Sequence, residues 1–318
     1  METNNLSPAV NVISNILNEV NKVVIGKENI TQKVLMAIIA GGHILIDDIP
    51  GVGKTTMALA FSKVLGLQHN RMQFTPDVLP TDITGFSVFN QSTGKFEFKT
   101  GVAVCNLFLA DEINRTSSKT QSALLEVMEE KKITVDGKTF ELPAPYVVIA
   151  TQNPVGSVGT QMLPESQLDR FMIKLSMGYP AHAAEIDILK NKTAENISNL
   201  AQITSAEEIT ALQKIVSKIY VDERIYDYMV RLADATRKHP MVNLGISPRG
   251  TLSLCAMSKA SALSHGRNYV IPDDIKFIFS DVAVHRLIPE NKAKLSGMTA
   301  EKIAEEIIKT VPLPKLQN

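Results

Sequence analysis

The sequence contains no tryptophan and only two cysteines, Cys105 and Cys255, among its 318 residues. The cysteines lie far apart in apolar stretches without a partner at metal-ligand spacing, which predicts small buried side chains and excludes a disulfide scaffold. Neither sign of charge is in excess, since 33 basic side chains balance 33 acidic ones. This balance disfavours a protein whose main activity is coating nucleic acid.

Long apolar runs are also missing. The longest, Val34–Ile46, is interrupted by Gly41, Gly42 and His43, and it is too short to cross a membrane. Residues 1–10 are polar and lack the basic segment followed by an apolar one that marks a secretory signal. We therefore expect no membrane segment and a cytoplasmic location.

The first part of the chain alternates helical periodicity with short apolar runs, which is typical of helices packed over a parallel sheet. The runs are short and apolar throughout, as strands buried on both faces should be. They predict a five-stranded sheet made of His43–Asp47, Arg71–Phe74, Leu107–Asp111, Val147–Thr151 and Phe171–Leu175.

Two further segments predict β-hairpins instead of crossover units. Lys132–Val135 and Lys138–Glu141 flank an Asp-Gly pair, which suits a two-residue turn with both residues at positive φ. A longer hairpin joins Phe86–Phe89 to Lys95–Phe98 through a polar loop. Both hairpins are expected as inserts in an α/β core.

The strand signals stop after Gly178–Pro180, and the remainder of the chain has helical patterns. Ser205 heads a capping box, and Ser247 followed by proline begins a long helix. The sequence therefore predicts two domains, an α/β core over residues 1–181 and a smaller all-α lid over residues 182–318.

A glycine-containing loop follows the first predicted strand. Its backbone N–H groups can surround the phosphates of a nucleotide, while Lys54 adds positive charge and the Thr55 hydroxyl reaches Mg²⁺. The pattern predicts a binding site for ATP and Mg²⁺. The residues expected to contact the nucleotide are Pro50, Gly51, Val52, Gly53, Lys54, Thr55 and Thr56.

The loop departs from the general phosphate-loop pattern at Asp48, which stands where a glycine is usual. A carboxylate aimed inward repels phosphate, so we expect this side chain to point away. The alternative interpretation is a chance Gly-Lys-Thr at a strand-to-helix turn.

An acid pair at the end of another apolar strand counts against that alternative. Asp111 and Glu112 follow Leu107–Ala110 directly. Asp111 can hold Mg²⁺ through its water shell, and Glu112 can orient and polarise the water that attacks the terminal phosphorus. The alternative is two solvated acids at the end of a strand, and the nearby phosphate loop counts against it. The acid pair and the loop together predict an ATPase.

Three more polar residues stand near the ends of predicted elements. Asn153 follows a buried strand, at the edge where ligands gather in open α/β sheets, although Asn-Pro is also common turn chemistry. Arg170 and Arg249 can supply the positive charge that a phosphoryl-transfer site needs, but spacing alone assigns neither, and a surface ion pair is the ordinary role of an arginine.

Taken together, these motifs resemble the MoxR family of AAA+ ATPases, and the resemblance runs from about Val24 to the final helices. It is carried by Pro50–Thr55, Gln73–Asp77, Ala110–Arg115, Ala150–Pro154 and Leu168–Phe171. The fold that it implies is an AAA+ P-loop core with two hairpin inserts, followed by the helical lid.

The resemblance also implies a role for each residue singled out above. It makes Lys54 and Thr55 Walker A residues, Asp111 and Glu112 Walker B residues, Asn153 sensor 1, Arg170 an arginine finger and Arg249 sensor 2. It implies a homo-hexameric ring, because an arginine finger works on the nucleotide of the neighbouring subunit. The partner that it implies is a client protein, in this family often one with a von Willebrand factor A domain.

The leading hypothesis is therefore a Mg²⁺-dependent ATPase that acts as a ring-forming chaperone or remodelling factor. One alternative is a nucleotide-gated assembly switch with slow turnover. Another is a DNA translocase, for which the hairpins offer only Lys95, Lys132 and Lys138 as nearby cations. Metal chelation through a partner complex, as in the related magnesium chelatase subunits, has no support from the scattered histidines.

Overall fold

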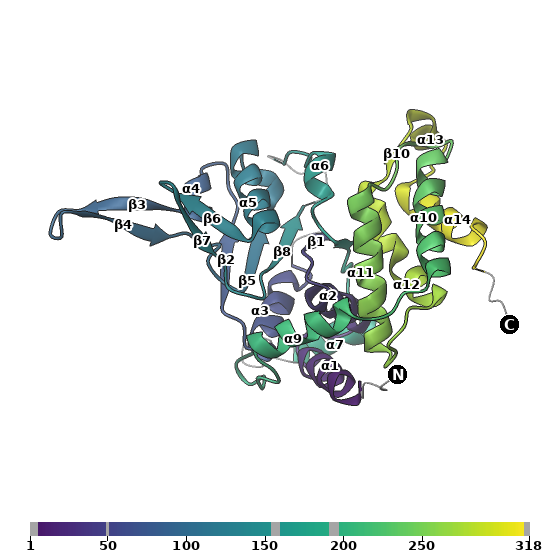
Figure 1. Ribbon diagram of the computed structural model, residues 1–318, viewed down its shortest axis with the longest axis horizontal. Helices are drawn as coiled ribbons and strands as arrows, with labels where there is room; N and C mark the ends of the chain where they lie inside the picture. Colours follow the sequence, from purple (N-terminus) through teal and green to yellow (C-terminus); the bar gives the residue numbers. More distant parts are fainter. Residues whose placement is uncertain (1–5, 49–50, 154–159, 191–196, 315–318) are drawn as a thin grey trace.

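The structure is a computed structural model that describes residues 6–48, 51–153, 160–190 and 197–314. Its centre is a sheet of five parallel strands in the order β2-β5-β8-β1-β9. Figure 1 labels β2, β5, β8 and β1 of this sheet. The strands are β1 (Ile44–Asp47), β2 (His69–Gln73), β5 (Leu107–Asp111), β8 (Val147–Gln152) and β9 (Ile173–Leu175). The five predicted strands are thus all present, and their ends differ from the prediction by at most two residues.

Successive side chains of these strands enter two separate hydrophobic layers, because residues of a strand alternate between the faces of a sheet. Ile44 and Ile46 face one layer, and Leu45 between them faces the other. The helices before residue 181 are α1 (Ser7–Val20), α2 (Glu28–Ile39), α3 (Lys54–Val64), α4 (Pro80–Thr84), the 3₁₀ helix η1 (Ile113–Arg115), α5 (Ser118–Glu130) and α6 (Glu165–Leu168), and α7 (His182–Lys190) follows just after it. Burial on both faces explains why the strands read as continuous apolar runs.

The second part of the chain is a helical lid with a small two-stranded sheet, β10–β11, at one end. Its elements are α9 (Ala206–Ser217), α10 (Glu223–Lys238), β10 (Val242–Leu244), α11 (Pro248–Ser264), α12 (Pro272–Ala283), η2 (Val284–Arg286), β11 (Ile288–Pro289), α13 (Asn291–Leu295) and α14 (Ala300–Thr310). The predicted helix starts are confirmed, since Ser205 accepts a hydrogen bond from the Glu208 amide and Ser247 accepts one from the Gly250 amide. The boundary between core and lid at residue 181 stays a prediction.

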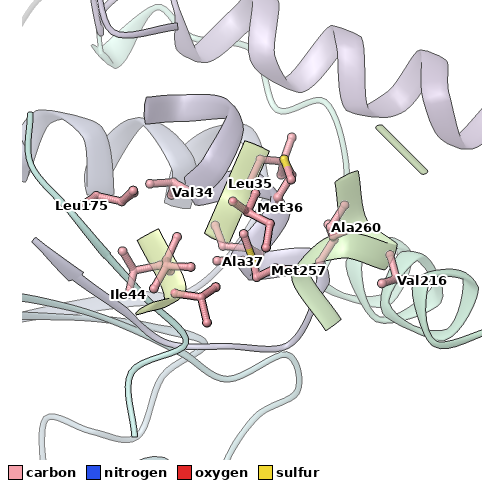
Figure 2. Close-up of a cluster of buried hydrophobic side chains, with 14 of the residues drawn as sticks. Val34, Leu35, Met36, Ala37, Ile44, Leu175, Val216, Met257 and Ala260 are labelled. Atoms are coloured by element: carbon pink, nitrogen blue, oxygen red, sulfur yellow. The ribbon is translucent and has the colours of Figure 1, made fainter. Parts of the chain in front are cut away.

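Core and lid share one hydrophobic cluster, and α2 lies in the middle of it. Figure 2 shows Val34–Ala37 of α2 between Ile44 and Leu175 of the sheet and Met257 and Ala260 of α11. Because α2 is apolar on both sides, it can bury one side against the sheet and the other against the lid. The position of the lid therefore follows from the position of the core.

Two hairpins leave the core, as predicted. They are β3 (Gly85–Asn90) with β4 (Lys95–Thr100), and β6 (Lys132–Val135) with β7 (Lys138–Glu141). The hairpin β3–β4 projects far from the body of the molecule (Figure 1). Phe98 and Phe140 stack with ring centroids 4.4 Å apart, so the two hairpins contact each other near their bases.

His43 joins three parts of the core just before β1. Its Nε2 donates to the carbonyl of Met128 at 2.9 Å, and its Nδ1 accepts from the amide of Val148 at 3.0 Å. These partners require a neutral ring with the proton on Nε2. Complete burial disfavours the charged form, and it lowers the pKa of His43 to about 4.

This histidine makes stability depend on pH. Since its folded pKa lies below that of the unfolded chain, the unfolded state takes up the proton first, and the folded state loses stability as the pH falls from about 6.5 to about 4. The difference corresponds to about 3 kcal/mol. We expect the melting temperature of His43→Gln, followed by scanning fluorimetry, to fall less steeply over this range than that of the wild type.

An exposed histidine provides the control for this measurement. His182 lies on the surface of α7, so His182→Gln should reproduce the wild-type pH profile. Parallel profiles for all three proteins would show that His43 is not the responsible group.

Candidate active site

The loop between β1 and α3 has the backbone of a phosphate loop. Gly51 and Gly53 adopt φ values of 85° and 94°, in the left-handed region that favours glycine. The helix begins directly after Gly53, at Lys54, so the free N–H groups of its first turn face the loop. Pro50, also expected to contact the nucleotide, lies outside the described residues.

The ammonium group of Lys54 is buried beside this loop. Its Nζ donates to the backbone carbonyl of Asp48 at 2.8 Å. Burial lowers the pKa of Lys54, and the negative charges of Asp48, Asp111 and Glu112 oppose that shift. The lysine is therefore a positive charge held among acids at the carboxyl edge of the sheet.

The side chain of Asp48 points away from the loop, as expected. Its Oδ2 accepts hydrogen bonds from the Ser176 hydroxyl at 3.1 Å and from the Gly178 amide at 2.7 Å. Both donors belong to the segment after β9. Asp48 thus ties the start of the phosphate loop to the connection that leads to the lid.

Asp111 ends β5 with both carboxylate oxygens engaged. Oδ2 accepts from Nε of Arg71 on β2 at 2.7 Å, and Oδ1 accepts from the hydroxyl of Thr151 on β8 at 3.2 Å. The same Thr151 hydroxyl accepts a hydrogen bond from the Glu112 amide at 2.9 Å. One threonine side chain therefore fixes both members of the acid pair.

Glu112 has an unusual backbone conformation, with φ of 58°. Its Oε2 accepts from the guanidinium of Arg115 at 2.8 Å. Partial burial opposes ionisation, but hydrogen bonds from Arg115, Asn153 and Gln73 prevail and hold the pKa of Glu112 below its ordinary value. The carboxylate is therefore charged at neutral pH.

Asn153 follows β8 and lies next to Glu112. Its backbone is clamped by Asn114, whose side chain donates to the Asn153 carbonyl at 3.1 Å and accepts from the Asn153 amide at 3.3 Å. The Oδ1 atom of Asn153 is buried and has no hydrogen-bond partner among the described residues. A buried acceptor of this kind calls for a donor such as a water molecule.

An apolar pocket of about 230 Å³ adjoins the phosphate loop. Its walls come from the segment between α1 and α2, the loop itself and the connection after β9, so it can accept a planar base at the end of a bound triphosphate. It is lined by Val23, Val24, Ile25, Lys27, Gly51, Val52, Gly53, Thr56, Met177, Pro180 and Ile188. Thr55 is partly buried in the first turn of α3.

Arg170 and Arg249 lie elsewhere. Strand β9 is parallel to β1 and pairs Ile173 with Ile44, so Arg170, just before β9, lies at the amino edge of the sheet, opposite the phosphate loop. Arg170 Nε contacts Glu129 Oε2 at 3.3 Å, and a guanidinium nitrogen of Arg249 donates to Glu129 Oε1. The structure thus brings the two arginines together, but far from Lys54.

A buried arginine joins core and lid behind this pair. Arg286 donates from Nε to Asp169 Oδ1 at 2.7 Å, and its other nitrogens donate to backbone carbonyls, including that of Phe171. The Ser247 hydroxyl, at the start of α11, also donates to Asp169 at 2.9 Å. These contacts fix the start of α11 next to the residues that precede β9.

Sequence reasoning missed several residues that hold the site together. Arg71 and Gln73 alternate along β2, and strand register places Gln73 beside Asp111. From the sequence, an arginine on an edge strand is expected to be an ordinary surface residue. Thr151 lies in the motif Ala150–Pro154, yet no local pattern indicates which groups its hydroxyl bonds. Arg286 gives none either, since the carboxylate that it bonds, Asp169, lies more than a hundred positions away.

Together, the five-stranded parallel sheet, the phosphate loop, the acid pair and the helical lid define an AAA+ P-loop ATPase. Sequence comparison agrees with this class. The ATPase family associated with various cellular activities (AAA) matches residues 43–173, and the AAA lid domain matches residues 234–307.

Similar proteins are found over nearly the full length. The chain is 46% identical to the Bacillus subtilis protein YeaC over 95% of both chains. It is 36% identical to the chaperone MoxR1 of Mycobacterium tuberculosis, over 98% of this chain and 85% of that one. A crystal structure assigned as an ATPase from Cytophaga hutchinsonii superposes with a TM-score of 0.91 at 35% identity, covering 98% of this chain and 97% of that one.

The chain therefore belongs to the MoxR family of AAA+ ATPases and is an enzyme that hydrolyses ATP. Within the described residues, no helix has the length and apolar character needed to span a membrane.

The double role of Thr151 leads to a prediction. Thr151→Val keeps the shape of the side chain but removes both hydrogen bonds to the acid pair. Because hydrogen bonds to charged groups are strong, we expect kcat for ATP hydrolysis to fall about tenfold or more, with little change in ATP affinity. Steady-state phosphate release and calorimetric titration with ATP measure the two quantities.

Thr151→Ser is the matched control because it keeps the hydroxyl, and it should retain most of the turnover. Equal turnover in the valine and wild-type proteins would show that the acid pair does not depend on Thr151.

Proposed function

We propose that this ATPase works as a homo-hexameric ring, in which one subunit holds each nucleotide and the next subunit completes its site, and that turnover remodels a partner protein. The observation that carries the proposal is the separation of the site residues. Lys54 and the acid pair lie at the carboxyl edge of the sheet, whereas Arg170 and Arg249 meet near its amino edge.

On the first subunit, the residues fit ATP and Mg²⁺. Lys54 and the amides of the loop from Gly51 to Gly53 hold the β- and γ-phosphates, and the apolar pocket beside them takes the base. Thr55 and Asp111 are oxygen donors of the kind that Mg²⁺ prefers. When bound, Mg²⁺ supplies positive charge against the phosphate oxygens.

Glu112 and Asn153 act on the attacking water. The lowered pKa of Glu112 keeps its carboxylate ionised, so it can accept a hydrogen bond from the water and polarise it. The Oδ1 of Asn153, which has no hydrogen-bond partner among the described residues, can accept a hydrogen bond from the second hydrogen of the same water. The water oxygen bonds to the γ-phosphorus as the bond to the β-phosphate oxygen breaks, and the proton that the water loses passes to Glu112, which yields ADP and phosphate.

Arg170 and Arg249 serve the neighbouring site. Their guanidinium groups meet the terminal phosphate of the next subunit's nucleotide and stabilise the charge that develops as its bond breaks. A closed ring gives every subunit a neighbour in the same orientation, which is why a head-to-tail contact suits this arrangement.

The partner is proposed to be a protein, handled by the projecting hairpin. Large apolar side chains of β3–β4 are exposed, most of all Phe96 at 74%. Exposed apolar patches of this kind mark interaction surfaces for proteins. A relative over nearly the full chain is named chaperone MoxR1, which supports a chaperone role, and a client with a von Willebrand factor A domain remains the expectation from family resemblance.

Cationic side chains do not favour DNA as the alternative partner. Lys132 on β6 is paired with Glu141 across its own hairpin at 3.0 Å. Lys95 lies directly beside the exposed Phe96, so the surface near the tip of β3–β4 combines apolar and charged side chains and is not uniformly basic. The other alternative was an assembly switch with slow turnover. It is disfavoured because the chain has both acids and both arginines that ATP hydrolysis requires.

Subunit mixing tests the shared site. Glu112→Gln should bind ATP, but its turnover should fall about 100-fold or more, because a general base contributes a rate factor of this order. Arg170→Ala should also be nearly inactive. Mixed in equal amounts, the two proteins form some sites with an intact Glu112 facing an intact Arg170, so phosphate release should recover to a measurable fraction of wild type.

Assembly of each variant is checked by light scattering before mixing. Failure of the mixture to recover, with both variants assembled, would contradict sharing of the site between subunits. Wild-type turnover in Glu112→Gln would contradict the proposed hydrolytic role.

The hairpin is tested with the ATP-bound, hydrolysis-deficient Glu112→Gln protein as bait. Phe96→Ser in that background should reduce the recovery of co-purifying client at least severalfold, because it removes an exposed apolar contact. The same substitution in the wild-type background should leave basal phosphate release unchanged. Unchanged recovery, together with DNA affinity that weakens steeply with salt, would favour the translocase instead.

A further inference from the structure

The two arginines proposed to act on the neighbouring nucleotide share one carboxylate. Arg170 precedes β9 in the core, and Arg249 lies in the first turn of α11 in the lid. Glu129, in the last turn of α5, receives one arginine on each oxygen. Glu129 of α5 therefore holds an arginine of the core and an arginine of the lid next to each other.

We propose that Glu129 is a positioning residue, which holds Arg170 and Arg249 together as one grip for the terminal phosphate of the neighbouring subunit's nucleotide. The inference rests on the proposed sharing of the site between subunits. It assigns a role to a residue that has no part in phosphate binding on its own subunit.

A purely structural role does not account for this cluster. The side chains of Arg170, Arg249 and Glu129 are 32%, 42% and 37% exposed. Ion pairs at this level of exposure contribute little to folding stability, since water screens them and the long side chains lose rotamer freedom. The joint between core and lid is already secured by the buried Arg286 and by Asp169.

Charge explains why the carboxylate is needed. Two guanidinium groups close enough to grip one phosphate repel each other, and the repulsion is offset by a negative charge between them. Without Glu129, the lid arginine and the core arginine would separate into solvent. An incoming phosphate would then have to bring both arginines together, which costs the conformational entropy of two flexible side chains.

Glu129 can stay in place while phosphate binds. Arg170 contacts it through Nε, and Arg249 through a single terminal nitrogen. A guanidinium has five N–H donors, and within the part of the chain that the structure describes the side chains of these two arginines have no acceptor other than Glu129. Each therefore keeps donors for an incoming phosphate, so Glu129 supports the grip and does not compete for it.

The helix that carries Glu129 also connects the two kinds of site. Helix α5 is capped by Ser117, shortly after Glu112, and runs to Glu130, about 20 Å at the usual rise per residue. Its start is held near the acid pair by the Gln121 side chain, which donates to the Ile113 carbonyl. A shift at the acid pair of one subunit can thus move the arginines that serve its neighbour.

The test measures kcat and KM for ATP on assembled protein. Glu129→Gln keeps the shape but removes the charge, so kcat should fall about tenfold while KM changes less than twofold, since the nucleotide is bound by the other subunit. Glu129→Asp should recover part of the loss. Glu130→Gln is the matched control, because Glu130 is exposed, adjacent and without an ion pair among the described residues, and it should behave like wild type.

Two further measurements separate positioning from general damage. Glu129→Gln combined with Arg170→Ala should lose less turnover than the product of the two separate losses, because the two changes share the contact between Glu129 and Arg170. Glu129→Gln mixed with Glu112→Gln should regain turnover, since intact arginine pairs then face intact acid pairs. If Glu129→Gln instead damaged the fold as a whole, its loss of turnover would appear in full in the double variant and would persist after mixing.

The outcomes decide between the inference and the proposal beneath it. Normal turnover in Arg170→Ala would contradict sharing of the site between subunits. A slow Arg170→Ala with a normal Glu129→Gln, multiplicative losses in the double variant, or failure of Glu129→Gln alone to assemble would each overturn the role of Glu129 only.

Discussion

The parallel alignment of the five strands is the constraint on which the rest of the structure depends. Parallel strands place all their carboxyl ends at one edge, so the residues that follow β1, β5 and β8 must meet there. Lys54, the acid pair and Asn153 come together for this reason. The same constraint sends Arg170 to the opposite edge, because it precedes its strand, and this explains why a second subunit is needed to complete the proposed site.

The carboxyl edge gathers several acids, and each is oriented by a different neighbour. Asp48 bonds the segment after β9, Asp111 bonds Arg71 and Thr151, and Glu112 bonds Arg115. These contacts direct the carboxylates while they balance their charge, so Lys54 is not surrounded by unpaired acids. The departure at Asp48 is thereby explained, since its carboxylate serves the connection to the lid and not the phosphates.

Core and lid are coupled at several points. The apolar cluster around α2 sets the position of the lid, and Asp169 with Arg286 fixes the start of α11 against the residues before β9. Glu129 then adds a polar contact between α5 and both arginines. The ends of α5 lie near the acid pair and at the arginines, so one helix links a subunit's own site to the residues that are proposed to complete the site of its neighbour.

Local patterns in the sequence determined the elements and half of the site. Apolar runs gave the five strands, the Asp-Gly pair gave a hairpin, and the loop before Lys54 with the acid pair after β5 predicted nucleotide hydrolysis, because these signals depend on neighbours along the chain. Only the tertiary structure decided which side chains meet. Thr151 with Asp111, Arg286 with Asp169, and two arginines with Glu129 are contacts between distant segments, and no local pattern encodes them.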